Sequence, residues 1–399
     1  MKYIVVLGDG MADLPLAELG GLTPLQKAKT PNMDFIAQNG RLGLVRTIPK
    51  GMAPSSDTAN LSVLGYDPEI YYTSRSSLET ASLGLKLSEN DLAYRCNLVT
   101  IEGDMMLDHS AGEITTEEAR VLIEELVREL DINNIKGVEL HAGTSYRHSL
   151  ILRDAKEGAV THPPHDYIGQ KWTNILPTER HSELFNELMK KSQEFLPNHE
   201  INQKRILEGK NPANSIWIWA EGKAPVLPLF YDKYAKKGAV ISAVDLIKGL
   251  GLCAGFEVIK VVGATGTLNT NYAGKVEAAL LALKSCDFVY LHIEAPDECG
   301  HRGNIEEKLL AIEYVDQRVL APIIAGLNER KEPYSLMVMP DHPTPISIRT
   351  HTDDPVPFAY YRSDGSEKPS GRNFDEENAA EMGDYIACGH DLMGEFIKE

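Results

Sequence analysis

The sequence predicts an α/β protein with a mostly parallel sheet flanked by helices and with an inserted α+β domain. Residues 3–7 form a short apolar run bounded by glycine and aspartate, which is typical of a buried strand in a parallel sheet. From residue 236 onward, apolar runs alternate with amphipathic segments, the order that produces parallel strands. Between residues 84 and 211 this alternation is lost, and short strands and helices follow one another irregularly.

The individual elements follow from the period of the apolar residues. In the part after residue 236 we expect strands at 239–242, 258–262, 288–293 and 335–339, and helices at 244–252, 272–284 and 305–327. In the middle part we expect strands at 98–101 and 149–152, and helices at 116–130 and 181–194.

The length of 399 residues favours two domains, or one core that carries a large insertion. Apolar strands that end in polar groups lie on both sides of the irregular middle part. We therefore expect a discontinuous core made of residues 1–83 and 212–399, with residues 84–211 inserted as a separate domain.

The composition is that of a globular protein, with 43% hydrophobic residues and a formal net charge of -18. An acidic chain repels phosphate backbones and anionic lipid, so neither nucleic acid nor a membrane is an expected partner. The start of the chain resembles a strand rather than a signal peptide, and we expect a cytoplasmic protein. The five cysteines show no paired spacing, which argues against a disulfide framework and a thiolate metal site.

Acidic and imidazole side chains follow the predicted strands that end near residues 7, 293 and 339. Asp297 and His301 stand four residues apart directly after the second of these strands, where we expect one loop to carry both. Since the carboxyl ends of neighbouring parallel strands meet at one edge of a sheet, these groups should converge if the strands are adjacent. Oxygen and nitrogen donors without thiolates suit Mg²⁺, Mn²⁺ or Zn²⁺. Taken singly, each residue could equally be a turn former, a helix cap or a core histidine. The candidate ligands are Asp9, Asp297, His301, Asp341, His342 and His351.

Ser56 is the candidate nucleophile, because two divalent ions activate an oxygen nucleophile and stabilise the attacking and leaving oxygens of a displacement. It precedes a predicted helix, whose amino terminus would favour a phosphorylated serine. An ordinary capping role for Ser55, Ser56 or Asp57 remains open at this stage.

Several segments match a known family over nearly the whole chain. They are Gly8-Asp-Gly-Met-Ala-Asp13, Ser56-Asp-Thr-Ala-Asn-Leu61, Gly65-Tyr-Asp-Pro68, residues 238–249, Gly263-Ala-Thr-Gly266, residues 294–301, Asp341-His-Pro-Thr-Pro345 and residues 351–357. On these segments the sequence resembles the archaeal-type cofactor-independent (2,3-bisphosphoglycerate-independent) phosphoglycerate mutases of the alkaline phosphatase superfamily.

The resemblance implies an alkaline-phosphatase-like core with a substrate-handling insert, and an enzyme that interconverts 3-phosphoglycerate and 2-phosphoglycerate in glycolysis and gluconeogenesis. It implies a phosphoserine at Ser56 and two divalent metal ions (Mn²⁺, Mg²⁺ or Zn²⁺), without 2,3-bisphosphoglycerate. By the same resemblance, one ion is held by Asp297, His301 and His351, and the other by Asp9, Asp341, His342 and Ser56.

A small phosphorylated anion needs basic partners. Arg95, Arg147 and Lys248 lie in matching stretches and are the expected substrate-binding residues, followed by Arg75 and His109. Departures from the family pattern at Ser55 and at residues 74–77 keep an alternative open, a homoserine kinase-like phosphotransferase in threonine biosynthesis. A binding protein with an inactive site is a third hypothesis, and the oligomeric state is left undetermined by the sequence.

Overall fold

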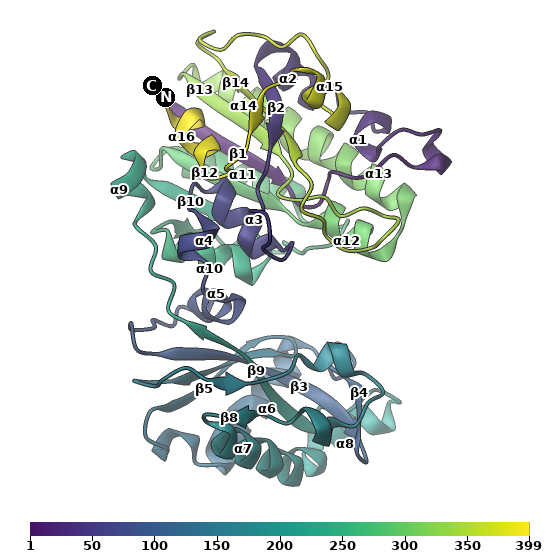
Figure 1. Cartoon of the computed structure of the whole chain (residues 1–399), viewed down its shortest axis with the longest axis vertical. Coiled ribbons are helices and arrows are strands. Elements are labelled where there is room, and N and C mark those ends of the chain that lie inside the picture. The colour runs from purple at the N-terminus through teal and green to yellow at the C-terminus, as the bar shows by residue number, and fades with distance from the viewer. Residues whose placement is uncertain (399) are drawn as a thin grey trace. The chain divides into compact units, whose positions relative to one another are not determined.

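The computed structural model describes residues 1–398 and divides into two compact units (Figure 1). The first unit contains Met1–Tyr72 and Leu227–Glu399, and the second contains Thr73–Val226. The second unit is thus longer at both ends than the predicted insert of residues 84–211. The reason is that β9 (Ser215–Lys223) pairs with β3 (Leu92–Glu102), and α5 (Arg75–Ser82) contacts both strands.

The first unit is built on an eight-stranded sheet in the order β11-β10-β12-β1-β13-β14-β2-β15. The pairs from β11 to β13 are parallel, β14 is antiparallel to β13 and β2, and β15 is parallel to β2. The prediction of a mostly parallel sheet flanked by helices is confirmed. The strands are β1 Lys2–Gly8, β2 Arg41–Val45, β10 Gly238–Ile241, β11 Glu257–Val258, β12 Phe288–Ile293, β13 Tyr334–Met339, β14 Val356–Arg362 and β15 Tyr385–Ile386.

The register of the three central strands brings their carboxyl ends to one level. Gly8 of β1 pairs with Ile293 of β12, and Leu7 pairs with Met339 of β13. The residues that follow these three strands therefore leave the sheet side by side, at the edge where open parallel sheets bind their ligands.

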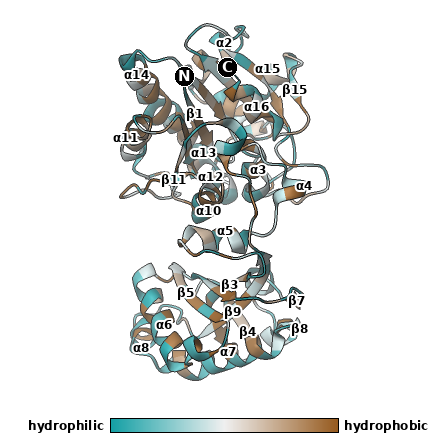
Figure 2. Ribbon diagram, turned by 90° about the vertical axis from the view of Figure 1, so that its left-hand side faces the viewer, coloured by the Kyte–Doolittle hydropathy of each residue, from teal (hydrophilic) through white to brown (hydrophobic). Residues whose placement is uncertain are grey.

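Helices cover both faces of this sheet (Figure 2). On one face, Ile4 and Val6 belong to a core formed with α2 (Pro31–Asn39), α11 (Tyr272–Ala282) and α13 (Ile305–Tyr314). On the other face, Tyr3 packs edge-on against Phe396. That face is covered by α3 Ser56–Val63, α10 Asp245–Cys253 and α16 Asp391–Ile397. Within residues 1–398, no helix is both long and apolar enough to cross a membrane.

Three expected elements differ from the structure. The strand expected at 98–101 is the end of the longer β3. The helix expected at 305–327 consists of α13 (Ile305–Tyr314), a π-helical turn (Val315–Leu320) and α14 (Ala321–Arg330). Pro322 cannot donate a backbone hydrogen bond, which interrupts the α-helical ladder at this point. The strand expected at 258–262 is reduced to β11, because the chain leaves the sheet edge after the amide of Ile259 bonds the Val240 carbonyl.

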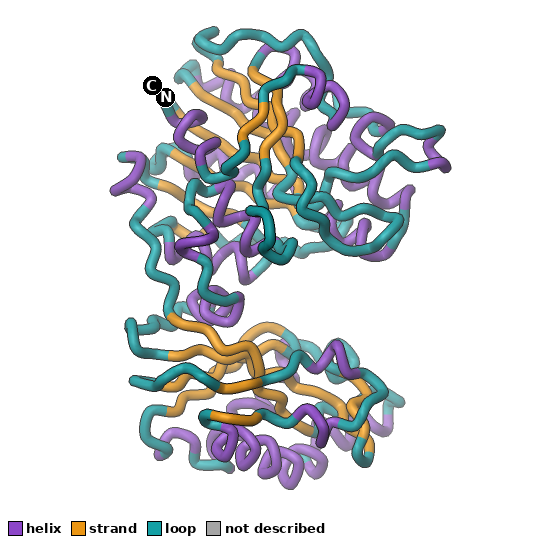
Figure 3. The backbone as a smooth tube through the Cα atoms, in the orientation of Figure 1, coloured by secondary structure: helices purple, strands orange, loops and turns teal. Residues whose placement is uncertain are grey.

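The second unit is an α+β domain (Figure 3), and it has its own apolar core. Its five-stranded sheet has the order β4-β3-β6-β5, and β9 pairs with the other edge of β3. All of these pairs are antiparallel. The further elements are β4 Met105–Asp108, β5 Val138–Thr144, β6 Arg147–Leu152, α6 Thr116–Glu129, α7 Ser182–Phe195 and α8 Glu200–Leu207.

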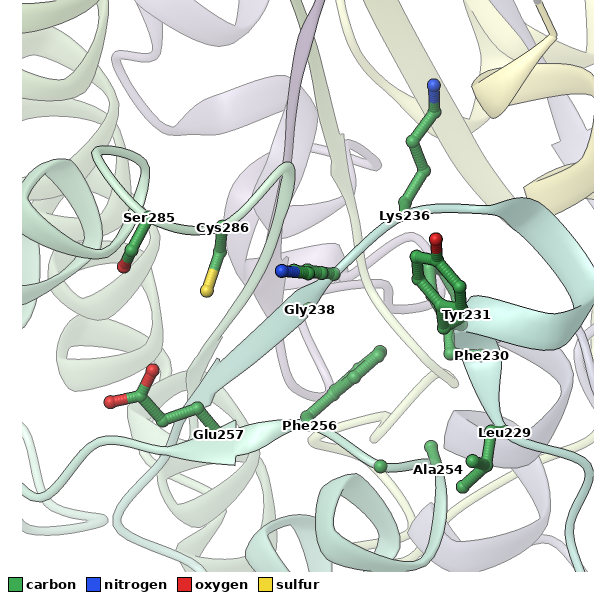
Figure 4. Close-up of a pocket in the computed structure, with 12 residues that line it drawn as sticks. Leu229, Phe230, Tyr231, Lys236, Gly238, Ala254, Phe256, Glu257, Ser285 and Cys286 are labelled. Carbon is green, nitrogen blue, oxygen red and sulfur yellow. The ribbon is translucent and has the colours of Figure 1, made fainter.

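A pocket of about 370 Å³ lies at the amino ends of β10 and β11 in the first unit (Figure 4). Gly238 and Glu257, the first residues of these strands, line it together with Phe230, Phe256 and Cys286. The pocket therefore belongs to the sheet edge opposite the one from which Asp9 and Asp341 emerge.

Candidate active site

Asp9 and Asp341 are placed by the carboxyl ends of β1 and β13. Asp9 follows Gly8 directly, and both carboxylates are buried. The backbone amide of Gly10 donates to Asp341 Oδ1 at 3.2 Å, and Asn60 Nδ2 donates to Asp341 Oδ2 at 2.8 Å. Gly10 has a positive φ of 62°, and a Cβ there would lie 2.5 Å from Thr344 Oγ1, so only glycine fits this turn.

Asp297 and His301 lie on α12 (Ala295–Arg302), one helical turn apart, rather than in the loop that the sequence suggested. The helix places both side chains on the same face, and His301 Nε2 lies 3.2 Å from Asp297 Oδ2. His351 approaches from the other side, with its Nε2 atom 3.4 Å from Asp297 Oδ1 and 2.9 Å from His301 Nε2. One carboxylate and two imidazoles thus converge on a common point.

His342 joins a second group of donors. Its Nε2 atom lies 3.5 Å from Asp9 Oδ1, 3.5 Å from Asp341 Oδ2 and 3.1 Å from Ser56 Oγ. The two groups are adjacent, because Thr344 Oγ1 donates to Asp297 Oδ1 at 2.5 Å and lies 3.3 Å from His342 Nδ1. The structure therefore brings together all seven predicted metal-site residues within the first unit.

Ser56 is the first residue of α3, and the N-cap position belongs to Ser55. Neither serine forms a side-chain capping bond to this helix, since Ser55 Oγ bonds the side chains of Asp57 and Thr58. The Ser56 hydroxyl instead faces His342. The geometry favours a chemical role for Ser56 over the capping role that the sequence left open.

Burial makes this cluster electrostatically unfavourable on its own. Burial, followed by the charges of Asp341 and Glu294, raises the pKa of Asp9 well above its usual value. Burial and the charge of Asp297 raise the pKa of Glu294 to about 8. Neighbouring carboxyl groups in a buried site resist simultaneous ionisation, so they need either protons or bound cations to offset their repulsion.

The imidazoles of His301 and His351 counteract this effect at Asp297. Burial opposes ionisation of Asp297, but the hydrogen bonds from both histidines outweigh it and hold its pKa well below the usual range. In turn, the hydrogen bond to Asp297 raises the pKa of His301 to about 9. In the protein without metal ions, the protonated side chain of His301 therefore supplies the positive charge beside Asp297.

The donors fit divalent metal ions. Asp297, His301 and His351 present ligand atoms within 4.8 Å of one another, and so do Asp9, Asp297 and His342. Asp9 Oδ1 is buried without a hydrogen-bond partner, which leaves a lone pair directed at the cluster. Carboxylate oxygens and imidazole nitrogens together suit Mn²⁺, Mg²⁺ or Zn²⁺.

The predicted substrate-binding residues lie in both units. Lys248, on α10 of the first unit, pairs with Asp245 at 2.5 Å. In the second unit, Arg95 is only partly buried, with 11% of its side chain exposed, lies 3.0 Å from Glu79 and stacks over the Trp219 ring at 4.4 Å. Burial lowers the pKa of Arg95 to about 10. Arg147 is exposed and stacks on Tyr146, so it is the more accessible of the two guanidinium groups.

Several polar residues of the cluster were not predicted. Glu294, His292, Asn60 and Thr344 all contact predicted ligands. His292 carries a sequence signal, because it is the polar residue in the apolar strand at 288–293. Asn60 and Thr344 have no such signal, since their partners come from distant parts of the chain.

Comparison with known proteins points to one family. The family model described as 2,3-bisphosphoglycerate-independent phosphoglycerate mutase matches residues 37–202. A Methanosarcina barkeri protein of that name is 52% identical over 400 residues, with 100% of both chains covered. A Methanothermobacter thermautotrophicus protein named 2,3-bisphosphoglycerate-independent phosphoglycerate mutase 2 is 45% identical and covers 98% of this chain and 96% of its own.

Two solved structures resemble this chain over nearly its full length. A Pyrococcus horikoshii protein is 32% identical with a TM-score of 0.83, and the match covers 99% of this chain and 96% of that one. The cofactor-independent phosphoglycerate mutase of Thermoplasma acidophilum is 28% identical with a TM-score of 0.68, over 100% and 99% of the two chains.

Mn²⁺ binding should depend steeply on pH and release protons. In the metal-free protein, His301 and Glu294 hold protons at pH 7, because their pKa values are raised to about 9 and about 8. Metal must displace these protons, so the apparent affinity should rise by about tenfold per pH unit for each proton released, between about pH 6 and 8. Calorimetry in buffers of different ionisation enthalpy measures the proton count directly.

The matched control is Asp341→Ala, which removes one carboxylate of the second group of donors. Mn²⁺ should raise the melting temperature of the unmodified chain, because it binds the native state, and raise that of Asp341→Ala much less. An affinity that does not change with pH, together with equal stabilisation of both proteins, would contradict the assignment of this cluster as a metal site.

Proposed function

Because this chain belongs to the 2,3-bisphosphoglycerate-independent phosphoglycerate mutase family, we propose that it interconverts 3-phosphoglycerate and 2-phosphoglycerate through a phosphoserine at Ser56. The family membership supports this overall reaction. Relatives that carry the name of this mutase are about half identical to this chain, and the match covers their full length. The observation that supports Ser56 as the nucleophile is its position, with Oγ 3.1 Å from His342 Nε2 at the start of α3.

We assign two metal ions to the two groups of donors. Asp297, His301 and His351 would hold one ion, and Asp9, Asp341, His342 and Ser56 the other. When bound, the ions offset the charge of the buried carboxylates, lower the pKa of the serine hydroxyl and withdraw charge from the phosphoryl group.

The reaction consists of two displacements at Ser56. In the first, Oγ attacks phosphorus in line, the bond from phosphorus to the 3-oxygen breaks, and the serine proton passes to that oxygen. In the second, the 2-hydroxyl of the retained glycerate attacks phosphoserine, its proton returns to Oγ, and the free serine is restored. The phosphoryl group at the α3 amino terminus also gains from the helix dipole. No external phosphate donor is consumed.

The substrate anion needs compensating charge, and we propose that Arg147 supplies part of it. Arg147 is exposed on β6, whereas the charge of Arg95 is already matched by Glu79. Glu79 Oε1 also accepts from Arg75 at 2.8 Å, so Arg75 and Arg95 share one carboxylate. Lys248 is paired with Asp245 and would bind substrate only by exchanging that partner. We also propose a cytoplasmic location, as the sequence suggested.

Replacing Ser56 with alanine should abolish phosphoryl transfer while leaving metal binding largely in place. Loss of the attacking oxygen should reduce kcat by more than about a thousandfold, in line with the removal of other serine nucleophiles. Six proposed ligands remain in this variant. Steady-state kinetics and Mn²⁺ calorimetry measure the two effects separately.

Ser55→Ala is the matched control, because it removes the neighbouring hydroxyl and leaves Ser56 in place. It should retain turnover and incorporate acid-stable phosphate from labelled 3-phosphoglycerate, whereas Ser56→Ala should incorporate none. Full activity of Ser56→Ala would remove Ser56 as the nucleophile.

The substrate assignment has its own test. In a coupled assay with Mn²⁺ and no added 2,3-bisphosphoglycerate, the protein should convert 3-phosphoglycerate to 2-phosphoglycerate. With homoserine and ATP, the same preparation should form no phosphohomoserine. Turnover of homoserine with none of 3-phosphoglycerate would overturn the substrate assignment and leave the metal assignment intact.

A further inference from the structure

His292 is a polar side chain near the carboxyl end of an otherwise apolar strand. It belongs to β12 and is fully buried. Its Nε2 atom lies 3.0 Å from Asp9 Oδ2, and its Nδ1 atom lies 3.2 Å from Ser242 Oγ. Both ring nitrogens thus have a partner, and the partners come from two further segments of the chain, one after β1 and one after β10.

The hydrogen-bond directions follow from the partners. An ionised Asp9 that binds a metal only accepts hydrogen bonds, so His292 Nε2 must carry the proton and donate it to Oδ2. His292 Nδ1 is then the acceptor, and Ser242 Oγ is its donor. The Val244 amide donates to Ser242 Oγ at 2.9 Å, which leaves the serine proton available for His292. The chain of bonds from Val244 to Asp9 therefore fixes one tautomer.

The consequence concerns the other oxygen of Asp9. With Oδ2 held by His292, the carboxylate cannot rotate freely, and Oδ1 is directed at His342 Nε2 at 3.5 Å. Oδ1 itself is buried and has no hydrogen-bond partner. We propose that His292, held by Ser242, is a positioning residue that orients Asp9 so that Oδ1 is presented to the metal ion.

Two other roles for His292 fit the structure less well. Asp9, His292 and Glu294 lie close enough to form a third cation site. A metal at His292 Nε2 would, however, displace the bond to Asp9, and Nδ1 is already occupied by Ser242. A purely structural histidine would stabilise the fold, but its loss would leave the affinity for metal unchanged.

The inference rests on the proposed metal sites, and Mn²⁺ calorimetry tests it. In His292→Leu, a side chain of similar size replaces the imidazole, and the hydrogen-bond donor to Asp9 is lost. It should weaken the binding of one of the two Mn²⁺ ions by about 10- to 100-fold, the range typical of residues that support metal ligands. His292→Gln retains an N–H donor of similar reach and should recover much of that loss. Activity of His292→Leu should rise towards the unmodified kcat at saturating Mn²⁺.

Ser242→Ala provides a second variant that leaves His292 in place. It removes the hydrogen bond that fixes the tautomer of His292. It should therefore weaken the same Mn²⁺ site, by a smaller factor than His292→Leu. It also keeps the test decisive if His292→Leu fails to fold, which the melting temperature in EDTA reports. The control His148→Leu alters another buried histidine, in β6 of the second unit, and should leave Mn²⁺ affinity unchanged.

The outcomes distinguish the positioning role of His292 from the proposed metal site itself. If Asp341→Ala loses one Mn²⁺ ion but folded His292 and Ser242 variants bind Mn²⁺ like the unmodified chain, the positioning role is wrong and the metal site stands. If Asp341→Ala also binds Mn²⁺ unchanged, the proposed metal site itself is wrong.

Discussion

The site depends on holding several carboxylates together away from water. Asp9, Glu294, Asp297 and Asp341 interact electrostatically with one another at one edge of the sheet, and Asp9, Asp297 and Asp341 are almost completely buried. Two unit charges about 4 Å apart repel each other by about 4 kcal/mol at an effective dielectric constant of about 20. Such a group is stable only if protons or cations offset the repulsion. The same requirement explains both the raised pKa of Asp9 and the affinity for divalent ions that we propose.

The parallel sheet provides this concentration of charge. Because β12, β1 and β13 are adjacent and in register, the residues after Gly8, Ile293 and Met339 emerge at one level. Helices then complete the site, since α12 carries Asp297 and His301 on one face and α3 begins at Ser56. Hydrogen bonds from residues that we do not assign as ligands orient the donors. Asn60 bonds Asp341, and Thr344 bonds Asp297.

Much of this arrangement could be predicted from the sequence. An apolar run followed by Asp9, or by Asp341 and His342, predicts a strand that delivers polar groups to the binding edge, and the recurrence of this pattern favoured a site over a turn or a core histidine. The family resemblance then selected the ligands and the nucleophile. The placement of Asp297 and His301 on a helix was not predicted, because the segment directly after the strand at 288–293, which includes Pro296, was expected to be a loop. Proline is in fact well tolerated in the first turn of a helix.

Other features depended on contacts that no local pattern encodes. The insert begins and ends outside residues 84–211, because the pairing of β9 with β3 joins segments that are distant in the sequence. The contact of His292 with Asp9 likewise requires the register of β1 and β12. Local periodicity predicts elements and their order, whereas the partners of a buried polar side chain depend on the tertiary packing.

The central claim is that the two groups of donors hold two metal ions beside Ser56. Anomalous diffraction at the manganese edge, from crystals grown with Mn²⁺, tests it directly. We expect two peaks, one in contact with Asp297, His301 and His351, and one in contact with Asp9, Asp341, His342 and Ser56. A single peak, or peaks away from these side chains, would contradict it.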